Sequence, residues 1–499
     1  MLNKVVILSD SFKGSISSQA IARLGKSVLE PYLPGKVVGW SIADGGEGTV
    51  QFFIDELGFK PVEVESVNAY LKPIRTQFAY LDEVAVFDVA SIVGFDVNDH
   101  LDIRHVTSYG IGLVLKEIIK RGFKKIYLGL GGSITNDGGS GLLEALGAKF
   151  YYEGKDVILH QNPFTKVDMV DTTELSKNLD TVQIVGLSDV KNPLLGEKGA
   201  TSVFGPQKGA TITDQAFLES WMAEYSHLFG IAPDTPGAGA AGGLGFSLLV
   251  MGATLLPGIK VMLDYLPIDE IDQDTLVITG EGALDKTSFD GKVVGEIVNL
   301  TKEKGNKLAI ICGINKYLEN LAYPIFPLHQ EVTNDYQLTV ESDLKEVFQK
   351  ILKEVITPLM ISAKEANALT DALMKLRRDI FVVEQGVDLA LEFDGQDDLY
   401  RHFEVYFGET VIGGARVKIK GATAVLGRIL IHKAYRHLGI GTYLMKELIK
   451  SLCSEGVQKF LIHAQTVAIP FYSQLGFVAV GDEFNEDGIM HYQMELIIE

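Results

Sequence analysis

Glycines and small polar residues follow an apolar run at residues 126–128, within KKIYLGLGGSITNDGGSGLLEALG (residues 124–147). The run predicts a β-strand, and Leu142, Leu143 and Leu146 predict a helix after the loop. Glycines let backbone N–H groups approach a ligand, and a helix N-terminus favours phosphate or carboxylate. We expect an anion-binding loop without the lysine of a Walker A motif, and a tight strand-to-helix turn is the structural alternative. The candidate contacts are Gly131, Gly132, Ser133, Asn136 and Asp137.

Carboxylates and lysines follow other apolar runs that predict β-strands. They are Asp10 and Lys13 after the first strand, Asp44 and Glu47 after the second, Asp189 after a strand at 182–187, Lys208 in the next loop, and Glu281, Asp285 and Lys292 after a strand at 275–279. Ligands of open α/β sheets bind at the carboxyl ends of strands, and such a mixture of charges suits a metal–nucleotide site. Helix capping by Asp44 and Glu47 and a salt-bridged turn at Glu281 and Asp285 are the structural alternatives.

A second chemical pattern lies near the C-terminus, where Arg436, Gly439 and Gly441 precede a predicted helix at 442–452. Successive backbone N–H groups and a helix N-terminus can wrap a pyrophosphate. A predicted strand at 460–464 then ends in Gln465, and FYSQLGF follows with Tyr472. Tyr472 is either a proton donor or a half-buried core aromatic.

The elements that position these residues alternate strand and helix over the first 60 residues, which indicates an α/β layer with a parallel sheet. Residues 61–106 are strand-rich and predict a second lobe or an inserted segment. The character changes near residue 367, where a helix precedes a strand-rich run at 402–431. We therefore place the domain boundary between Ile356 and Glu365.

The composition limits the partners. The chain has 499 residues, 46% of them hydrophobic, and a net charge of -20, which argues against nucleic acid or anionic membrane as the main partner. Two isolated cysteines, Cys312 and Cys453, and a start without signal-peptide features predict a reducing cytoplasm. The uncharged run at 238–259 is rich in glycine and contains Pro257, so we expect a loop and a buried helix there, not a membrane span.

Seven motifs in the first 358 residues resemble the type I glycerate kinase family. They are DSFKGS (10–15), ADGGEGT (43–49), GLGGSITNDGG (129–139), NPLLGEKGAT (192–201), FGPQKGAT (204–211), GAAGGLG (239–245) and TGEGALD (279–285). The resemblance implies two α/β lobes with the site between them, and transfer of the ATP γ-phosphate to D-glycerate with Mg²⁺, at the 2-hydroxyl. The chain departs from the family pattern at residues 286–288 and at Val293 and Val294, which puts roles around Thr287 in doubt.

On this resemblance we assign hypothetical roles to the charged residues. Lys13 and Lys208 supply cations, and Asp189 accepts or orients the hydroxyl proton of glycerate. The ligands of Mg²⁺ or of substrate hydroxyls are Asp10, Asp44, Glu281 and Asp285. Glu47 and Lys292 complete the expected nucleotide and substrate contacts.

Residues 367–499 resemble the GNAT acetyltransferase family, whose acetyl-CoA pyrophosphate motif matches the loop at 436–441 without gaps. The implied acetyl-CoA contacts are Ile429, Ile431, Arg436, His437, Gly439, Ile440, Gly441, Thr442, Gln465 and Tyr472. The resemblance implies that Tyr472 protonates the departing thiolate. Glu384, His463 and His491 are the candidate bases.

We thus predict a glycerate kinase at residues 1–358 with a lobe inserted at roughly 61–240, a linker at 359–366 and a GNAT domain at 367–499. The alternative is a kinase for another small hydroxy acid whose GNAT-like domain only binds acetyl-CoA and regulates. The expected partners are D-glycerate, ATP and acetyl-CoA, with the acetyl acceptor, the 2- or 3-phosphoglycerate product and a homo-oligomer left open.

Overall fold

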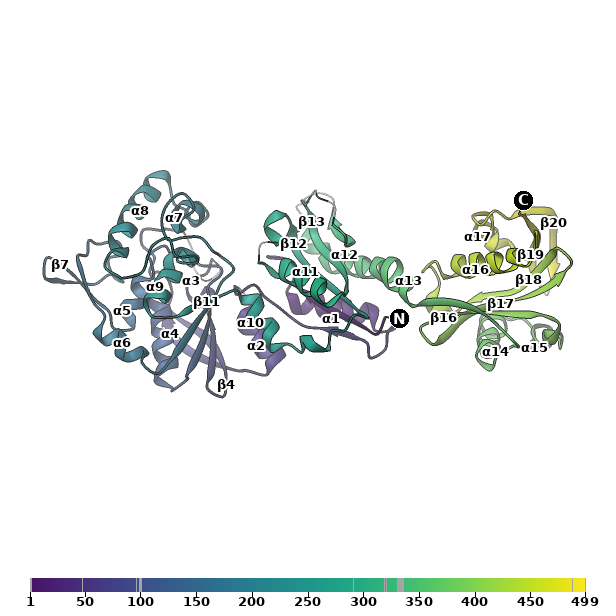
Figure 1. The fold of residues 1–499 in the computed structure, drawn as a ribbon, viewed down its shortest axis with the longest axis horizontal. Coiled ribbons are helices and arrows are strands. Elements are labelled where there is room, and N and C mark those ends of the chain that lie inside the picture. The colour runs from purple at the N-terminus through teal and green to yellow at the C-terminus, as the bar shows by residue number, and fades with distance from the viewer. Residues whose placement is uncertain are drawn as a thin grey trace. The chain divides into compact units, whose positions relative to one another are not determined.

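The computed structural model describes residues 2–46, 48–95, 97, 101–289, 291–317, 319, 321–329, 336–486 and 488–498. The chain forms two compact units, an N-terminal unit at residues 3–348 and a C-terminal unit at residues 349–499 (Figure 1). Across the described ranges, no helix is long and apolar enough to cross a membrane.

The first sheet of the N-terminal unit has the strand order β14-β13-β12-β1-β2, and all neighbouring strands are parallel. Its strands are β1 (Lys4–Ser9), β2 (Val37–Gly39), β12 (Thr275–Leu284), β13 (Lys307–Asn315) and β14 (Ile325–His329). Its helices are α1 (Ser18–Leu29), α2 (Thr49–Leu57), α10 (Gly258–Tyr265), α11 (Val293–Lys304) and α12 (Tyr336–Ile351). The near-continuous apolar runs of β1 and β12 are buried, as expected for a parallel sheet covered by helices.

The second sheet has the order β11-β10-β6-β5-β4-β3, parallel from β11 to β5 and antiparallel from β5 to β3. Its strands are β3 (Lys60–Val67), β4 (Pro73–Leu81), β5 (Val84–Asp88), β6 (Lys125–Gly129), β10 (Gln183–Leu187) and β11 (Thr254–Leu256). They all lie between β2 and β12 in the chain. The second lobe is therefore an insertion that reaches β11, beyond the predicted limit near residue 240.

The inserted lobe also contains a small antiparallel sheet and seven α-helices among its described residues. The strands are β7 (Lys149–Tyr152), β8 (Lys155–Val157) and β9 (Met169–Asp171); the helices are α3 (Ala90–Val93), α4 (Tyr109–Lys120), α5 (Ser140–Ala145), α6 (Thr173–Leu179), α7 (Ala200–Phe204), α8 (Ile212–Ser226) and α9 (Leu244–Val250).

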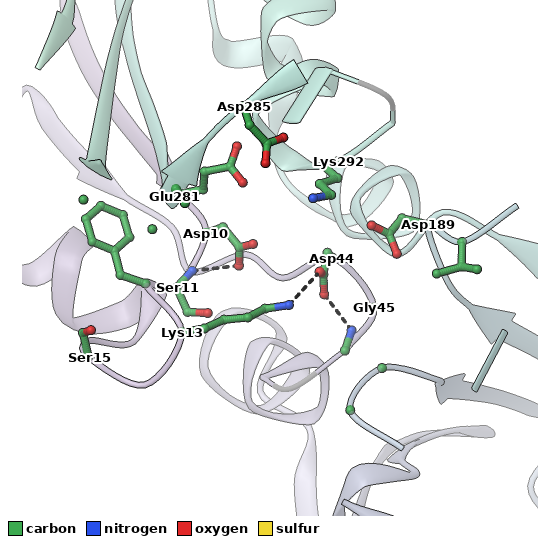
Figure 2. A pocket seen from close by; sticks show the side chains of 18 of the residues that line it. Asp10, Ser11, Lys13, Ser15, Asp44, Gly45, Asp189, Glu281, Asp285 and Lys292 are labelled. Carbon is green, nitrogen blue, oxygen red and sulfur yellow. Dashed lines mark hydrogen bonds and ion pairs between the residues drawn. The ribbon is translucent and has the colours of Figure 1, made fainter. Parts of the chain in front are cut away.

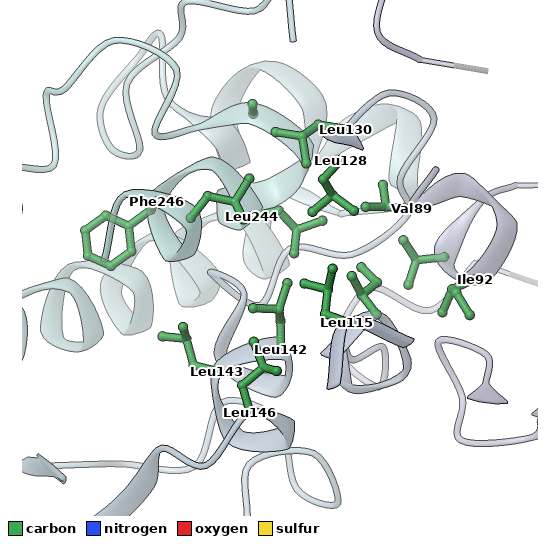
Figure 3. Packing of buried hydrophobic residues seen from close by; sticks show 14 of the residues in the cluster. Val89, Ile92, Leu115, Leu128, Leu130, Leu142, Leu143, Leu146, Leu244 and Phe246 are labelled. Atoms are coloured by element: carbon green, nitrogen blue, oxygen red, sulfur yellow. The ribbon is translucent and has the colours of Figure 1, made fainter. Parts of the chain in front are cut away.

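Among the described residues, two large apolar clusters lie in the N-terminal unit. One lies within the inserted lobe, where Leu128 of β6 is in one buried cluster with Leu115 of α4, Leu142 of α5 and Phe246 of α9 (Figure 3). The other combines residues of both sheets with helices between them: Val6, Leu8 and Val277 from the first sheet, Val86, Tyr127 and Val185 from the second, and Phe53 of α2. Burying each large apolar side chain stabilises the fold by roughly 1.5–3 kcal/mol, so the shared core ties the two sheets together.

The C-terminal unit is built on one seven-stranded sheet with the order β15-β16-β17-β18-β19-β21-β20, antiparallel except for the parallel pair β18–β19. The strands are β15 (Ile361–Ala366), β16 (Arg401–Phe407), β17 (Thr410–Lys420), β18 (Thr423–Ile431), β19 (Lys459–Gln465), β20 (Val478–Glu486) and β21 (Ile489–Ile497). The helices are α13 (Thr357–Met360), α14 (Asp371–Arg377), the π-helix η6 (Arg378–Glu384), α15 (Leu389–Glu392), α16 (Ile440–Ser454) and α17 (Ile469–Ser473). Figure 1 shows α16 and α17 on one side of this sheet and α14 and α15 on the other.

The sequence predicts a linker at residues 359–366, but the structure has the end of a helix and a β-strand there. The helix containing Met360 ends directly before β15, and all six residues of β15 pair with β16. β15 is an edge strand with a mixed polar sequence, so backbone hydrogen bonds define it and its side-chain pattern does not.

Candidate functional site

A cavity of about 1060 Å³ opens in the N-terminal unit where strands of both sheets end. The residues expected from the sequence that line it are Asp10, Lys13, Asp44, Gly131, Gly132, Ser133, Asp189, Lys208, Glu281, Asp285 and Lys292. Figure 2 shows the acidic side chains and two lysines of this set around a common space. The first sheet supplies the ends of β1 and β12 and the loop after β2, and the second sheet supplies the loops after β6 and β10.

Two glycine loops, one from each sheet, meet at this cavity. The N–H of Gly131 donates to the carbonyl of Gly45 at 3.4 Å. A Cβ on Gly131 would lie 2.4 Å from Cα of Gly46, and a Cβ on Gly258 would lie 2.4 Å from Cα of Gly45. Contacts below 3.0 Å leave no room for a side chain, so backbone approaches backbone and the loops bring the ligand groups of both sheets together.

The carboxylates of the cavity repel one another. Burial and the neighbouring charges of Asp44 and Glu281 raise the pKa of Asp10 to about 7, although Ser11 and Lys13 oppose the shift. Burial also raises the pKa of Asp189, with Asp44 as the next cause. The pKa of Glu281 is raised mainly by burial, and its Oε1 atom is buried without a hydrogen-bond partner among the described residues.

Two lysines and one hydrogen-bonded turn balance part of this charge. Nζ of Lys13 lies 3.8 Å from Oδ2 of Asp44 (Figure 2). Nζ of Lys292 donates to Oγ1 of Thr287 at 3.0 Å, and that threonine donates its N–H and its hydroxyl to Asp285, each at 2.7 Å. The hydroxyl bond from Thr287 is the main cause that lowers the pKa of Asp285. Thr287, where the chain departs from the family pattern, therefore orients Asp285 and is linked to Lys292.

The acidic side chains fit a magnesium ion bound together with phosphate. Among the residues the structure describes, no three carboxylate, histidine or thiol groups are arranged to hold a metal ion by themselves. Mg²⁺ does not need such a cage, because it usually binds one or two carboxylates plus phosphate oxygens and waters. Asp10, Asp44 and Glu281 offer oxygen ligands, and a cation would relieve both their repulsion and the unpaired Oε1 of Glu281.

The structure corrects the role expected for Asn136 and Asp137. Both are buried and neither lines the cavity. Asp137 accepts hydrogen bonds from the N–H and hydroxyl of Ser108 at 2.8 Å each, and from N–H groups at the start of α5, including that of Gly139 at 3.1 Å. Asn136 donates to Oγ1 of Thr201 at 2.9 Å. These side chains therefore hold the glycine loop from inside the protein and do not line the cavity.

Lys208 lines the cavity, but its side chain also supports the glycine loop from inside the protein. Its side chain is buried, and Nζ donates to the carbonyl of Thr135 at 2.7 Å. Burial lowers the pKa of Lys208 to about 7, against the opposing charge of Asp137. An ammonium group whose charge is weakened in this way is better suited to fixing the loop than to neutralising a phosphate.

Sequence reasoning missed several residues of the cavity, and one residue that it predicted cannot be placed. Glu47 lies outside the described residues. Lys316 and His329 line the cavity just after β13 and at the end of β14, so the rule that ligands bind at strand ends could have identified them. Ser188 and Gln207 line it as well, the first directly after β10.

Two neighbouring parallel strands of the C-terminal unit pair over only part of their length. β18 and β19 pair only from Thr423–Lys459 to Leu426–Ile462, while each strand continues beyond that point. Ile429 and Ile431 are half-buried on the part of β18 that lies beyond its pairing with β19 and is still paired with β17. The loop that follows contains His437 and Gly439 at φ +67° and +81°, and Gly439 starts α16 without a side-chain cap.

This backbone fits a pyrophosphate group. The left-handed residues turn the loop so that it leads into the helix N-terminus, and α16 begins with Ile440, Gly441 and Thr442. The first N–H groups of a helix have no intrahelical partner and the helix dipole favours an anion there. Gly441 also packs closely, because a Cβ at this position would lie 3.3 Å from the ring of Phe471.

The polar residues predicted for this site already have protein partners. Arg436 forms a two-point ion pair with Glu384, and Gln465 donates to Gln385 at 3.0 Å. Tyr472 is buried, and burial raises its pKa to about 12, so its hydroxyl keeps a proton to donate.

The three candidate bases differ in their surroundings. The Arg436 guanidinium lowers the pKa of the Glu384 carboxyl, which makes that carboxylate a weaker base. His463 pairs with Glu486 at 2.9 Å, and Nδ1 of His491 lies 2.9 Å from the carbonyl of Ile489. Of the three, His463 has the carboxylate partner that a catalytic histidine commonly uses for orientation.

Comparison with known proteins found two matching family models. The model described as the glycerate kinase family matches residues 5–355, and that of the acetyltransferase (GNAT) domain matches residues 390–498. A glycerate kinase of Bacillus subtilis (strain 168) is 36% identical over 306 residues, covering 58% of this chain and 79% of the relative. A glycerate 2-kinase of Escherichia coli (strain K12) is 32% identical and covers 62% and 85%. A solved structure provisionally assigned as glycerate kinase 2 of Salmonella typhimurium LT2 superposes with a TM-score of 0.61 at 30% identity, covering 70% of this chain and 97% of that one.

Proposed function

The chain belongs to the glycerate kinase family and carries a GNAT acetyltransferase domain, and from this premise we propose that its N-terminal unit phosphorylates D-glycerate with ATP, at the 2-hydroxyl. The observation that carries the proposal is the convergence of five carboxylates, four lysines and two glycine loops on one cavity of about 1060 Å³. Such a cavity has the size of typical small-molecule sites and has room for a nucleotide beside a three-carbon acid.

Phosphoryl transfer requires positioning of the reactants and neutralisation of the charge on the phosphate oxygens. Lys13 and Lys292 bring ammonium groups to the cavity from the loop after β1 and the turn before α11. The backbone of Gly131, Gly132 and Ser133 forms the cradle for an anionic group of the nucleotide or of glycerate. Asp10, Asp44 and Glu281 would hold Mg²⁺, which would supply positive charge to offset that of the phosphate groups.

Asp189 is the group that takes the proton from the glycerate hydroxyl. It follows β10, faces the cavity beside Asp44 and has a raised pKa, which makes it a stronger base than an exposed aspartate (Figure 2). Asp285 faces the same space but is bound to Thr287, so we assign it to orientation of the turn that bears Lys292.

The C-terminal unit transfers an acetyl group from acetyl-CoA to an amine. The loop from Arg436 to Gly441 and the start of α16 bind the pyrophosphate, Ile429 and Ile431 flank the pantetheine arm, and Tyr472 returns a proton to the departing thiolate. The amine acceptor is to be identified by a screen that measures released CoA.

The kinase proposal is tested with the full chain, ATP, Mg²⁺ and D-glycerate, using phosphorus NMR of the product. We expect a single phosphomonoester whose coupling pattern identifies the 2-phosphate. The 3-phosphate would correct the regiochemistry, and no phosphorylation of glycerate would refute the proposal. L-glycerate and lactate serve as acceptor controls.

A further inference from the structure

A glutamate carboxylate forms an ion pair with Arg436, the arginine of the predicted pyrophosphate loop. Glu384, the last residue of η6, faces Arg436 with Oε1–Nη1 at 2.6 Å and Oε2–Nη2 at 2.9 Å. Nε of Arg436 donates to the carbonyl of Ile431 at 3.0 Å. The guanidinium is therefore fixed by three hydrogen bonds, and the two N–H groups that form its outer fork point at Glu384.

The next residue makes a second contact, with the last residue of β19. Gln385 accepts a hydrogen bond from Nε2 of Gln465 at 3.0 Å. Arg436 lies in the loop after β18 and Gln465 ends β19, and these strands stop pairing at Leu426–Ile462. Residues 384–385, which we call the strap, thus connect the two sides of the opening between the strands.

The ion pair between Glu384 and Arg436 is accessible, so a ligand anion can replace the carboxylate on the guanidinium. The side chains of Arg436 and Glu384 are 33% and 34% exposed, so an anion from solvent can reach the guanidinium without unfolding the loop. Carboxylate and phosphate are both bound by the fork of an arginine through two parallel hydrogen bonds. One fork cannot serve both groups at once, and a carboxylate left beside a pyrophosphate would repel it.

We propose that Glu384 is an internal competitor for the pyrophosphate of acetyl-CoA. It holds Arg436 in the absence of the cofactor, and the cofactor must displace it to use the guanidinium. The strap therefore sets the affinity for CoA and for acetyl-CoA. The inference rests on the proposed acetyl-CoA site and adds a residue that opposes binding there.

The test is calorimetric titration of the full chain with CoA, using wild type, Glu384→Gln and Asp379→Asn. Glutamine keeps the size of Glu384 and removes its charge. Asp379 lies on the same π-helix with an exposed side chain, so Asp379→Asn makes the same charge change away from Arg436. Exposed ion pairs contribute up to about 1 kcal/mol, equivalent to roughly fivefold, and the removed repulsion adds to this. We expect the Kd for CoA to fall about 3- to 10-fold in Glu384→Gln and to stay within about twofold in Asp379→Asn.

Ionic strength separates competition from a structural effect. The advantage of Glu384→Gln should shrink below about twofold in roughly 1 M salt, because screening weakens both the ion pair and the repulsion. An unchanged or raised Kd in Glu384→Gln would overturn the inference, since it would make Glu384 neutral or a positioning partner of Arg436. An equal gain in Asp379→Asn would overturn it as well. Absence of CoA binding by all three proteins would instead refute the proposed acetyl-CoA site.

Discussion

Replacement of Asp189 by asparagine should remove most of the kinase turnover and leave the fold intact. The carboxylate faces the cavity and is no member of the ion pairs found among the described residues, so its removal breaks no such structural link. The loss should come from proton transfer, because asparagine cannot accept the hydroxyl proton. A general base contributes about 10²–10⁴-fold, or roughly 3–5 kcal/mol of the activation free energy. We therefore expect kcat for D-glycerate to fall by about 10²–10⁴-fold.

The assay couples ADP formation to a visible signal at saturating ATP and Mg²⁺, with circular dichroism and thermal unfolding as checks of the fold. Asp234→Asn is the matched control, because Asp234 is an exposed aspartate of the same lobe. Its kcat should equal that of wild type. A kcat for Asp189→Asn within threefold of wild type would show that proton removal does not depend on Asp189.

Three other substitutions test the glycine loop, the buried lysine that supports it and the C-terminal domain. Gly131→Ala should lower the free energy of unfolding by about 1–3 kcal/mol in urea, because its Cβ would lie 2.4 Å from Cα of Gly46, whereas Gly230→Ala, with no neighbour within 4 Å, should not. Burial lowers the pKa of Lys208 from 10.5 to about 7. Between these pH values the unfolded chain holds a proton on this lysine that the folded chain lacks. The contribution of Lys208 to the free energy of unfolding therefore rises with pH, by at most about 1.4 kcal/mol per pH unit. Denaturation at several pH values should show that Lys208→Met loses this rise; an identical slope in both proteins would contradict it. Tyr472→Phe should leave the Kd for CoA unchanged and slow CoA release with an amine acceptor by about 10²-fold, and unchanged release would assign the tyrosine to the core.

The position of most candidate ligands could be predicted because one topological rule covers them. Asp10 directly follows β1, Asp189 lies two residues after β10 and Glu281 is one of the last four residues of β12, and the structure brings all three to one cavity. The carboxyl ends of parallel strands share one edge of a sheet, so a correct strand prediction is enough to group such residues. Lys316 and His329 satisfy the same rule and were missed because no glycine-rich motif surrounds them.

The direction of a side chain could not be predicted in the same way. Asp137 lies in the glycine loop as Ser133 does, yet Asp137 binds N–H groups at the starts of α4 and α5 and Ser133 lines the cavity. A loop that turns through left-handed glycines reverses the face of successive residues, and the partners that decide the outcome, Ser108 and Lys208, are distant in the chain. The sequence indicates the residue types near a site, and only packing shows which of them support it from inside.

The two glycine loops explain how separate sheets can share one site. Asp44 comes from the first sheet and Asp189 from the second, and the pKa of Asp189 is raised in part by the charge of Asp44. That coupling requires the lobes to stay close, which the shared apolar core and the backbone contact between Gly131 and Gly46 provide. A side chain at Gly131 would push the loops apart and so weaken the electrostatic coupling between the carboxylates. The glycines of this unit therefore fix the spacing of the acidic groups that come from different lobes.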